Sequence, residues 1–123
     1  MEHDLGIPAI RAWFSALPAS DKVYALLVIM HEITIVMRTI SVDYPHDCET
    51  RWRLAYRLSQ MNHRFTAAAL AMMLNEPTYP DDELLEILLR QERNPELARA
   101  CRQVLEDTVE IVNTMRAGKA QNG

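Results

Sequence analysis

Glycine is absent from this 123-residue chain between Gly6 and Gly118. Because glycine permits positive φ and a close approach of backbone to ligand, its absence excludes Gly-rich phosphate loops, dinucleotide-binding fingerprints and tight Asn-Gly or Asp-Gly hairpins. Apolar residues in the same interval recur every three or four positions, and no long run alternates with a period of two. This pattern predicts an all-α fold without a sheet.

The composition indicates one folded domain. A chain of this length buries about two-thirds of the surface that its unfolded form exposes. Its content of 49% hydrophobic and 24% charged residues argues against disorder. The formal net charge of −4 gives no general attraction to nucleic acid or anionic lipid. Only Lys22 and Lys119 are lysines among the 13 basic residues, so the bidentate and stacking contacts of arginine are widely available.

Cysteine usage and the N-terminal residues lead us to expect a cytoplasmic protein. Cys48 and Cys101 are too few for a disulfide framework, which fits a reducing compartment. Residues 1–5 contain Glu2 and Asp4 and lack the basic region of a signal peptide.

Residues 23–42 form the most apolar stretch of the chain. The stretch contains His31, Glu32 and Arg38, and each of these side chains is costly to place in lipid. We therefore predict a buried helix here and no contact with a membrane.

Prolines and capping residues divide the chain into helical segments. Asp47 and Asn94 are expected N-caps, because each precedes a helical pattern, and Ser20 is expected to cap another helix. Gly118 is expected to end the last helix. The predicted helices span residues 8–17, 20–42, 48–75, 81–92 and 95–117.

These segments predict a compact antiparallel helical bundle of four main helices plus a short N-terminal helix, because their connections are short. Residues 1–118 would form the single helical domain, and residues 119–123 a flexible C-terminal tail.

The predicted helix at residues 20–42 has two apolar stripes. The broad stripe, expected to face the core, consists of Leu26, Ile29, Met30, Ile33, Val36, Met37 and Ile40. The narrow stripe, with alternating spacings of four and three as in a coiled-coil seam, gives the expected dimer-interface residues Tyr24, Val28, His31, Ile35 and Val42. A small domain has little surface with which to cover two faces of one helix, so we predict a homodimer through the narrow stripe. Burial of this stripe within the monomer is the alternative.

The predicted helix at residues 48–75 carries arginines interleaved with aromatic side chains. The candidate partner-binding residues are Arg51, Trp52, Arg53, Tyr56, Arg57, His63 and Arg64. The pattern fits a surface for an acidic protein partner, since Trp, Tyr and Arg often dominate binding energy. It also fits phosphate contacts with base stacking. A third interpretation is a solvated face whose arginines pair with acids such as Asp81, Asp82, Glu83 and Glu86.

Metal-binding spacings are missing from the sequence, so we predict neither a metal site nor a cofactor. No Glu-x-x-His or His-x-x-x-His pair occurs. His31, Glu32 and His63 could meet only through the tertiary fold, which leaves a ligand- or metal-binding bundle as an alternative. Neighbouring carboxylates, such as Asp81 with Asp82 or the group Glu106, Asp107 and Glu110, fall on faces expected to be exposed, where a solvated charge is usual.

The sequence thus favours a non-enzymatic interaction module, which would be a small adaptor, regulator or chaperone-like protein. This hypothesis rests on the missing catalytic, phosphate-binding and metal-binding patterns and on the two candidate contact stripes. Nucleic-acid binding through the Arg-aromatic face is the less favoured alternative, because the chain is acidic overall.

Overall fold

The computed structural model describes residues 6–77, 81–90 and 94–122; the side chains of Ser41, Asp81, Asp82, Ala120, Gln121 and Asn122 lie outside this description. Within these ranges the chain is helical and has no strand. The elements are α1 (Ile7–Ala16), α2 (Ala19–Asp43), α3 (Cys48–Met73), α4 (Asp81–Leu84), α5 (Glu86–Leu89) and α6 (Pro95–Asn122). The predicted all-α class is confirmed.

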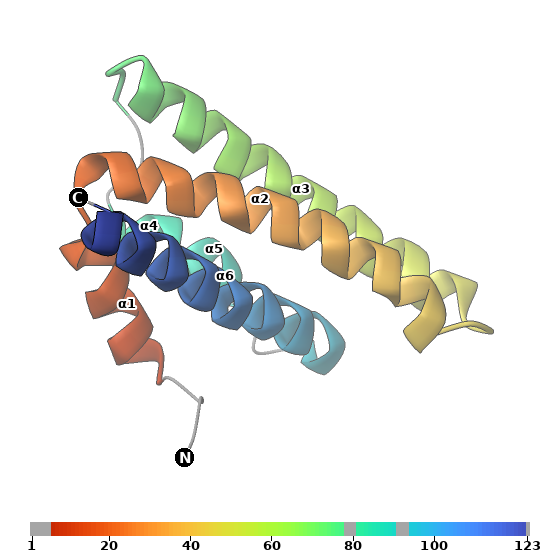
Figure 1. The fold of residues 1–123 in the computed structure, drawn as a ribbon. Coiled ribbons are helices and arrows are strands. Elements are labelled where there is room, and N and C mark those ends of the chain that lie inside the picture. The colour runs from red at the N-terminus through yellow and green to blue at the C-terminus, as the bar shows by residue number, and fades with distance from the viewer. Residues whose placement is uncertain (1–5, 78–80, 91–93, 123) are drawn as a thin grey trace.

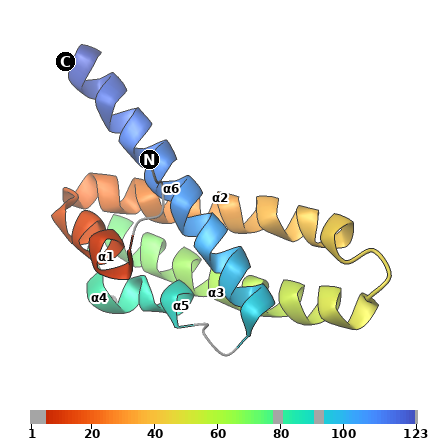
Figure 2. The same ribbon diagram turned by 90° about the horizontal axis from the view of Figure 1, so that it is seen from below.

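Helix α2 is the central element of the fold (Figure 1). It forms a long antiparallel hairpin with α3 and also packs against α6. Figure 2 shows that α6 crosses the hairpin obliquely, so that its C-terminal turns project beyond α2. The short helices complete the structure, because α1 contacts α4 and α5 contacts α6.

The core is built from the predicted apolar stripes. In the broad stripe of α2, four side chains are buried and the other three pack against the core partly buried. The short helices contribute to the same cluster as the long ones. The largest fully buried side chains are Phe14, Phe65, Ile10, Leu26, Ile29, Ile33, Leu54, Leu58, Leu84, Leu85, Leu97 and Leu105.

Two predicted N-caps are confirmed. Asp47 Oδ1 accepts a hydrogen bond from the Thr50 amide at 3.0 Å, and Asp47 Oδ2 accepts one from the Thr50 hydroxyl at 2.6 Å. These bonds hold the pKa of Asp47 below its ordinary value, and the positive charges of two arginines on α3 lower it further. Asn94 Oδ1 accepts a hydrogen bond from the Leu97 amide at 3.1 Å. Each cap satisfies an amide that the first helical turn leaves unpaired.

The third predicted cap, Ser20, is wrong. Helix α2 begins at Ala19, and Pro18 occupies the N-cap position without a side-chain hydrogen bond. Proline is suited to the start of a helix because it has no amide hydrogen to satisfy and its φ is already fixed near the helical value.

The predicted helix at residues 81–92 is interrupted. In its described part the chain forms two four-residue helices, α4 and α5, which meet at Leu85. Helix α4 packs against α1 whereas α5 packs against α6, so the two halves follow different neighbours. Residues 91–92 lie outside the described residues. Two short helices therefore replace the third of the four predicted main helices.

The prediction that Gly118 ends the last helix is also wrong, because α6 continues to Asn122. Gly118 does not adopt the positive φ of a terminating glycine. Arg116 Nε lies 3.2 Å from Asp21 Oδ2, and Lys119 Nζ lies 3.7 Å from Asp21 Oδ1. These ion pairs join the last turns of α6 to the first turn of α2 and help to offset the cost of a helical glycine, about 1 kcal/mol. The domain boundary expected at residue 118 thus falls inside a helix.

Residues Ala19–Ile40 of α2 are long and apolar enough, by length and composition alone, to cross a membrane. A central helix of a folded domain has the same character, because it is apolar on more than one side. In this fold the segment packs against both α3 and α6.

Candidate functional site

The outer face of α3 carries the predicted Arg-aromatic residues. Trp52 and Tyr56 are 73% and 65% exposed. The other predicted partner-binding side chains are exposed as well, except for Arg51, which is half-buried. Aromatic side chains of this kind usually bury about 150–250 Å² each. Two of them exposed one turn apart therefore mark an unusual stretch of helix surface.

Arg51 is held in place by the turn that precedes α3. Its Nη1 donates to the Pro45 carbonyl oxygen at 3.3 Å, and its Nη2 contacts Cys48 Sγ at 2.8 Å. The Pro45 carbonyl oxygen of the turn and the Cys48 thiol at the start of α3 thus orient the Arg51 guanidinium.

One acid expected to pair with the arginines of α3 has other partners. The Glu86 carboxylate contacts the guanidinium of Arg11 on α1, and Glu86 Oε2 lies 3.2 Å from Arg90 Nε. The side chains of Asp81 and Asp82 lie outside the described residues. Glu86 therefore gives no support to the interpretation that acids such as these neutralise the arginines of α3.

The exposed face of α3 extends further than the sequence analysis proposed. Its midline follows alternating spacings of four and three through the exposed residues Trp52, Tyr56, Ser59, His63, Thr66, Leu70 and Met73. Leu70, Met73 and Leu74 are 54%, 59% and 58% exposed. This spacing is that of a seam that packs on a neighbouring helix, and no described helix covers it. The sequence signal for this longer face was Leu70, which lies two heptads after Tyr56 and therefore on the same side of the helix.

A second exposed stripe follows α2 and contains most of the predicted dimer interface. Tyr24 and Ile35 are 37% and 36% exposed, and Val42 is 76% exposed. Val28 departs from the prediction, since it is 9% exposed and belongs to the core. Leu27, at 43% exposure, lies on the surface beside it in sequence. The surface stripe therefore differs from the predicted one at this position.

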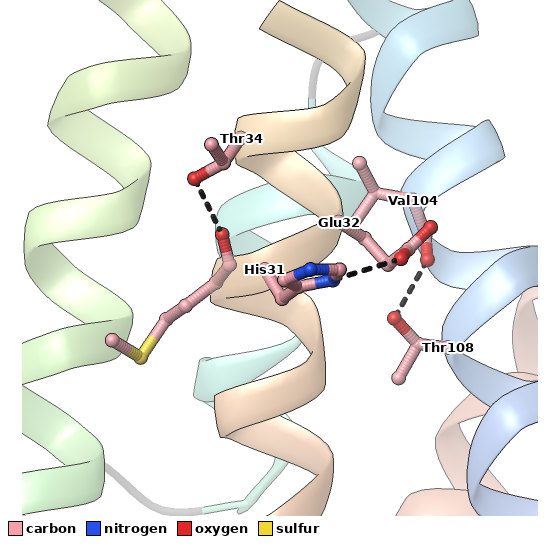
Figure 3. Close-up of polar contacts among 6 residues, drawn as sticks. His31, Glu32, Thr34, Val104 and Thr108 are labelled. Atoms are coloured by element: carbon pink, nitrogen blue, oxygen red, sulfur yellow. Dashed lines mark hydrogen bonds and ion pairs between the residues drawn. The ribbon is translucent and has the colours of Figure 1, made fainter.

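A buried carboxyl lies between α2 and α6. Glu32 is 7% exposed, and Figure 3 shows its side chain extending from α2 toward α6. Asp107 of α6 lies near enough to act on the Glu32 carboxyl. His31, with a side chain 70% exposed, places its Nδ1 3.4 Å from Glu32 Oε2. Gln103 Nε2 donates to Asp107 Oδ1 at 2.9 Å. The expectation of an exposed Asp107 is wrong, because this residue is half-buried and faces Glu32.

This environment raises the pKa of Glu32 above its ordinary value. Burial is the largest cause, because it removes water from the carboxylate, and the nearby carboxyl group of Asp107 acts in the same direction. His31 acts in the opposite direction.

The three residues considered as a metal or ligand site do not form one. His31 and Glu32 lie together, but His63 lies on the exposed outer face of α3. In the part of the chain that the structure describes, no three His, Cys, Asp or Glu side chains are placed to hold a metal ion. The third polar group beside Glu32 is Asp107, which sequence spacing did not indicate.

An open groove of about 460 Å³ lies where the end of α2 and the beginning of α3 meet the first turns of α6. Its volume is within the usual range of small-ligand sites, about 300–1,000 Å³. Neither histidine nor cysteine is among its described lining residues, which are Val36, Thr39, Ile40, Asp43, Tyr44, Leu54, Glu96, Arg99, Ala100 and Gln103. The polar side chains of this described lining include the carboxyl groups of Asp43 and Glu96 and the hydroxyl group of Tyr44.

The chain matches no protein-family model, and neither a curated protein nor a solved structure matches it.

Proposed function

We propose that this protein is a non-enzymatic interaction module, a small cytoplasmic adaptor or regulator, that binds an acidic helix of a partner protein along the outer face of α3. The observation that carries this proposal is the exposure of Trp52 and Tyr56, at 73% and 65%, on a face that also bears arginines. Trp, Tyr and Arg are the residues most enriched among those that dominate binding energy at interfaces.

The shape and chemistry of the α3 face support a helical partner. A midline with alternating spacings of four and three matches the contact positions of a second helix. Leu70 and Met73 would contact apolar residues of that helix, while Arg53, Arg57 and Arg64 would face its acidic side chains. Exposed leucine and methionine side chains suit an apolar helix better than a phosphate backbone, which favours protein over nucleic acid.

A pair of designed helical peptides tests this proposal. Both peptides carry leucines with the same seam spacing, but one has glutamates and the other lysines at the flanking positions. The variant Trp13→Phe leaves Trp52 as the single tryptophan, so its fluorescence reports binding at the α3 face. We expect the acidic peptide to bind and to shift this emission to shorter wavelength. Trp52→Ala, whose binding is measured by calorimetry because it lacks the reporter, should weaken binding by about 30-fold or more, as at interface hot spots.

The control for this experiment is Arg99→Ala, which removes an exposed arginine on α6 and should leave the affinity unchanged. Equal binding of the acidic and basic peptides would contradict the proposed partner chemistry. Tighter binding of single-stranded DNA than of either peptide, with a steep dependence on salt, would favour the nucleic-acid alternative instead.

The exposed stripe on α2 supports a second part of the proposal, which is that the protein acts as a homodimer through this stripe. Tyr24, Leu27 and Ile35 are each more than one-third exposed on a helix whose other sides are occupied by α3 and α6. We expect sedimentation at micromolar concentration to give a dimer that Ile35→Glu converts to a monomer. The matched control, Tyr56→Glu on α3, should leave the dimer intact, and a monomeric wild-type protein would contradict the predicted interface.

A further inference from the structure

We propose that the open groove between α2, α3 and α6 binds a small organic cation, namely an amine carried on an apolar body. This inference goes beyond the proposed function, because the groove lies away from the outer face of α3. It meets α3 at the buried Leu54, whereas the exposed Tyr56 lies about 200° further round the same helix.

The deepest part of the groove is apolar. Ile40 and Leu54 are buried there, and Val36 and Ala100 are partly buried against the same core. An apolar group that lies on these side chains leaves water, which is favourable. The volume of about 460 Å³ has room for a body of the size of a phenyl ring with a short side arm. This part of the groove therefore selects for an apolar body.

Two carboxyl groups stand beside this apolar surface. Asp43 is the exposed last residue of α2, and Glu96 is a half-buried residue in the first turn of α6. Among the residues that the structure describes, no basic side chain forms an ion pair with either carboxylate. A few polar groups beside an apolar surface are typical of small-ligand sites, and these two complement a cation.

The end of α2 adds to the negative potential of the groove. A helix leaves its last carbonyl groups without intrahelical partners, and its C-terminus carries the equivalent of about half a negative charge. Helix α2 is 25 residues long, ends at Asp43 and has no basic residue in its last turn. The N-terminus of α6 has the opposite polarity, but Glu96 lies in its first turn and compensates it. The strongest attraction for a cation is therefore beside Asp43.

Two further lining residues bear on the charge of the ligand. Tyr44 contributes an aromatic ring, and the faces of such rings attract cations. Arg99 opposes a cation, but its side chain is exposed and also borders a second groove between α5 and α6. The formal net charge of −4 adds to the attraction of the two carboxylates.

Titration with four phenyl compounds of similar size tests the proposal. They are 2-phenylethylamine, 2-phenylethanol, 3-phenylpropionate and phenylalanine, which at pH 7 are a cation, a neutral molecule, an anion and a zwitterion. Binding is followed through the backbone amide resonances of the full chain. We expect the amine to shift resonances in the last turns of α2 and the first turns of α6, and to bind about threefold more tightly than each other compound.

Three outcomes of this titration would overturn the proposal. Binding of the alcohol as tightly as the amine would show that the groove selects only for the apolar body. Tighter binding of phenylalanine would show that the site is built for a zwitterion, with Arg99 holding its carboxylate. The absence of amine-induced shifts around the groove, or shifts confined to the outer face of α3, would show that the amine does not bind here.

Charge variants at the edge of the groove give a second test, with effects of opposite sign. Asp43 and Arg99 are both exposed, so their variants are expected to fold. Asp43→Asn should weaken amine binding by about three- to fivefold, as loss of a partly exposed ion pair does. Arg99→Gln removes a like charge and should strengthen amine binding. Glu110→Gln, which alters an exposed acid of α6 outside the groove, is the matched control. Equal weakening by Asp43→Asn and Glu110→Gln would refute the site, because it would reflect net charge alone.

Discussion

The two cysteines show how strongly the surroundings determine the chemistry of a single residue type. Cys101 is 1% exposed, and its Sγ lies 3.8 Å from Met61 Sδ in the core. Burial raises the pKa of the Cys101 thiol to about 12, and the charge of Arg57 opposes this shift only in part. Cys48 is exposed at the beginning of α3. Because the thiolate is the reactive form, the two thiols should differ in reactivity.

A thiol-labelling experiment measures this difference. At pH 8 we expect a disulfide reagent to label one thiol per folded chain and two in denaturant. Cys101 is buried in the folded protein, and pH 8 lies far below the pKa of its thiol there. Cys48→Ala should abolish the labelling of the folded protein, while Cys101→Ala should leave it unchanged. Rapid labelling of both thiols in the folded wild type would contradict the burial of Cys101.

Helix ends in this protein depend on tertiary contacts as much as on terminating residues. Asp47 and Asn94 begin α3 and α6 through side-chain hydrogen bonds that a sequence pattern identifies well. Gly118, in contrast, lies within α6, whose last turns are attached to Asp21 of α2. A terminating residue acts only if the chain beyond it makes no better contact by remaining helical.

The substitution Gly118→Ala tests the continuation of α6. A Cβ at this position would meet no atom within 4 Å, and the backbone does not have positive φ. Alanine should therefore stabilise the protein by about 0.4–1 kcal/mol in urea unfolding, because it restricts the unfolded chain and favours the helix. Destabilisation would indicate that the helix ends at Gly118 with a left-handed residue, which alanine adopts poorly.

At the scale of the whole molecule, one face of α3 contributes to the stability of the fold and the opposite face is the proposed binding surface. One side of this helix is buried against the core, and the other is a continuous exposed seam. Leu58 is 0% exposed, whereas Leu70 on the same helix is 54% exposed. Substitutions on the two sides should therefore affect different properties.

Leucine-to-alanine variants on the two sides provide a matched comparison. Leu58→Ala should lower the free energy of unfolding by about 2–5 kcal/mol, because it leaves a cavity in the core. Leu70→Ala should change that free energy by less than about 0.5 kcal/mol, as surface substitutions usually do. The second variant should instead weaken binding of the acidic helical peptide. Equal loss of stability in both variants would indicate that Leu70 belongs to the core.

The sequence by itself determined the all-α class, the main core stripes and the caps at Asp47 and Asn94. It also identified the Arg-aromatic residues as one side of a helix, and Trp52 and Tyr56 are exposed there. These features depend on the periodicity of one helix about its own axis, or on contacts between residues three positions apart. Both kinds of information are present in a short segment of sequence.

Only the tertiary structure decided which face meets which neighbour. It brought Asp107 of α6 near Glu32 of α2 and buried Val28 in the core. It also broke the predicted helix at residues 81–92 into two at Leu85 and extended α6 beyond Gly118. Each outcome depends on where α6 crosses the hairpin of α2 and α3 and on how the short helices pack beside it. Crossing geometry arises from the combined shapes of two helix surfaces, so the spacing of residues within either helix does not contain it.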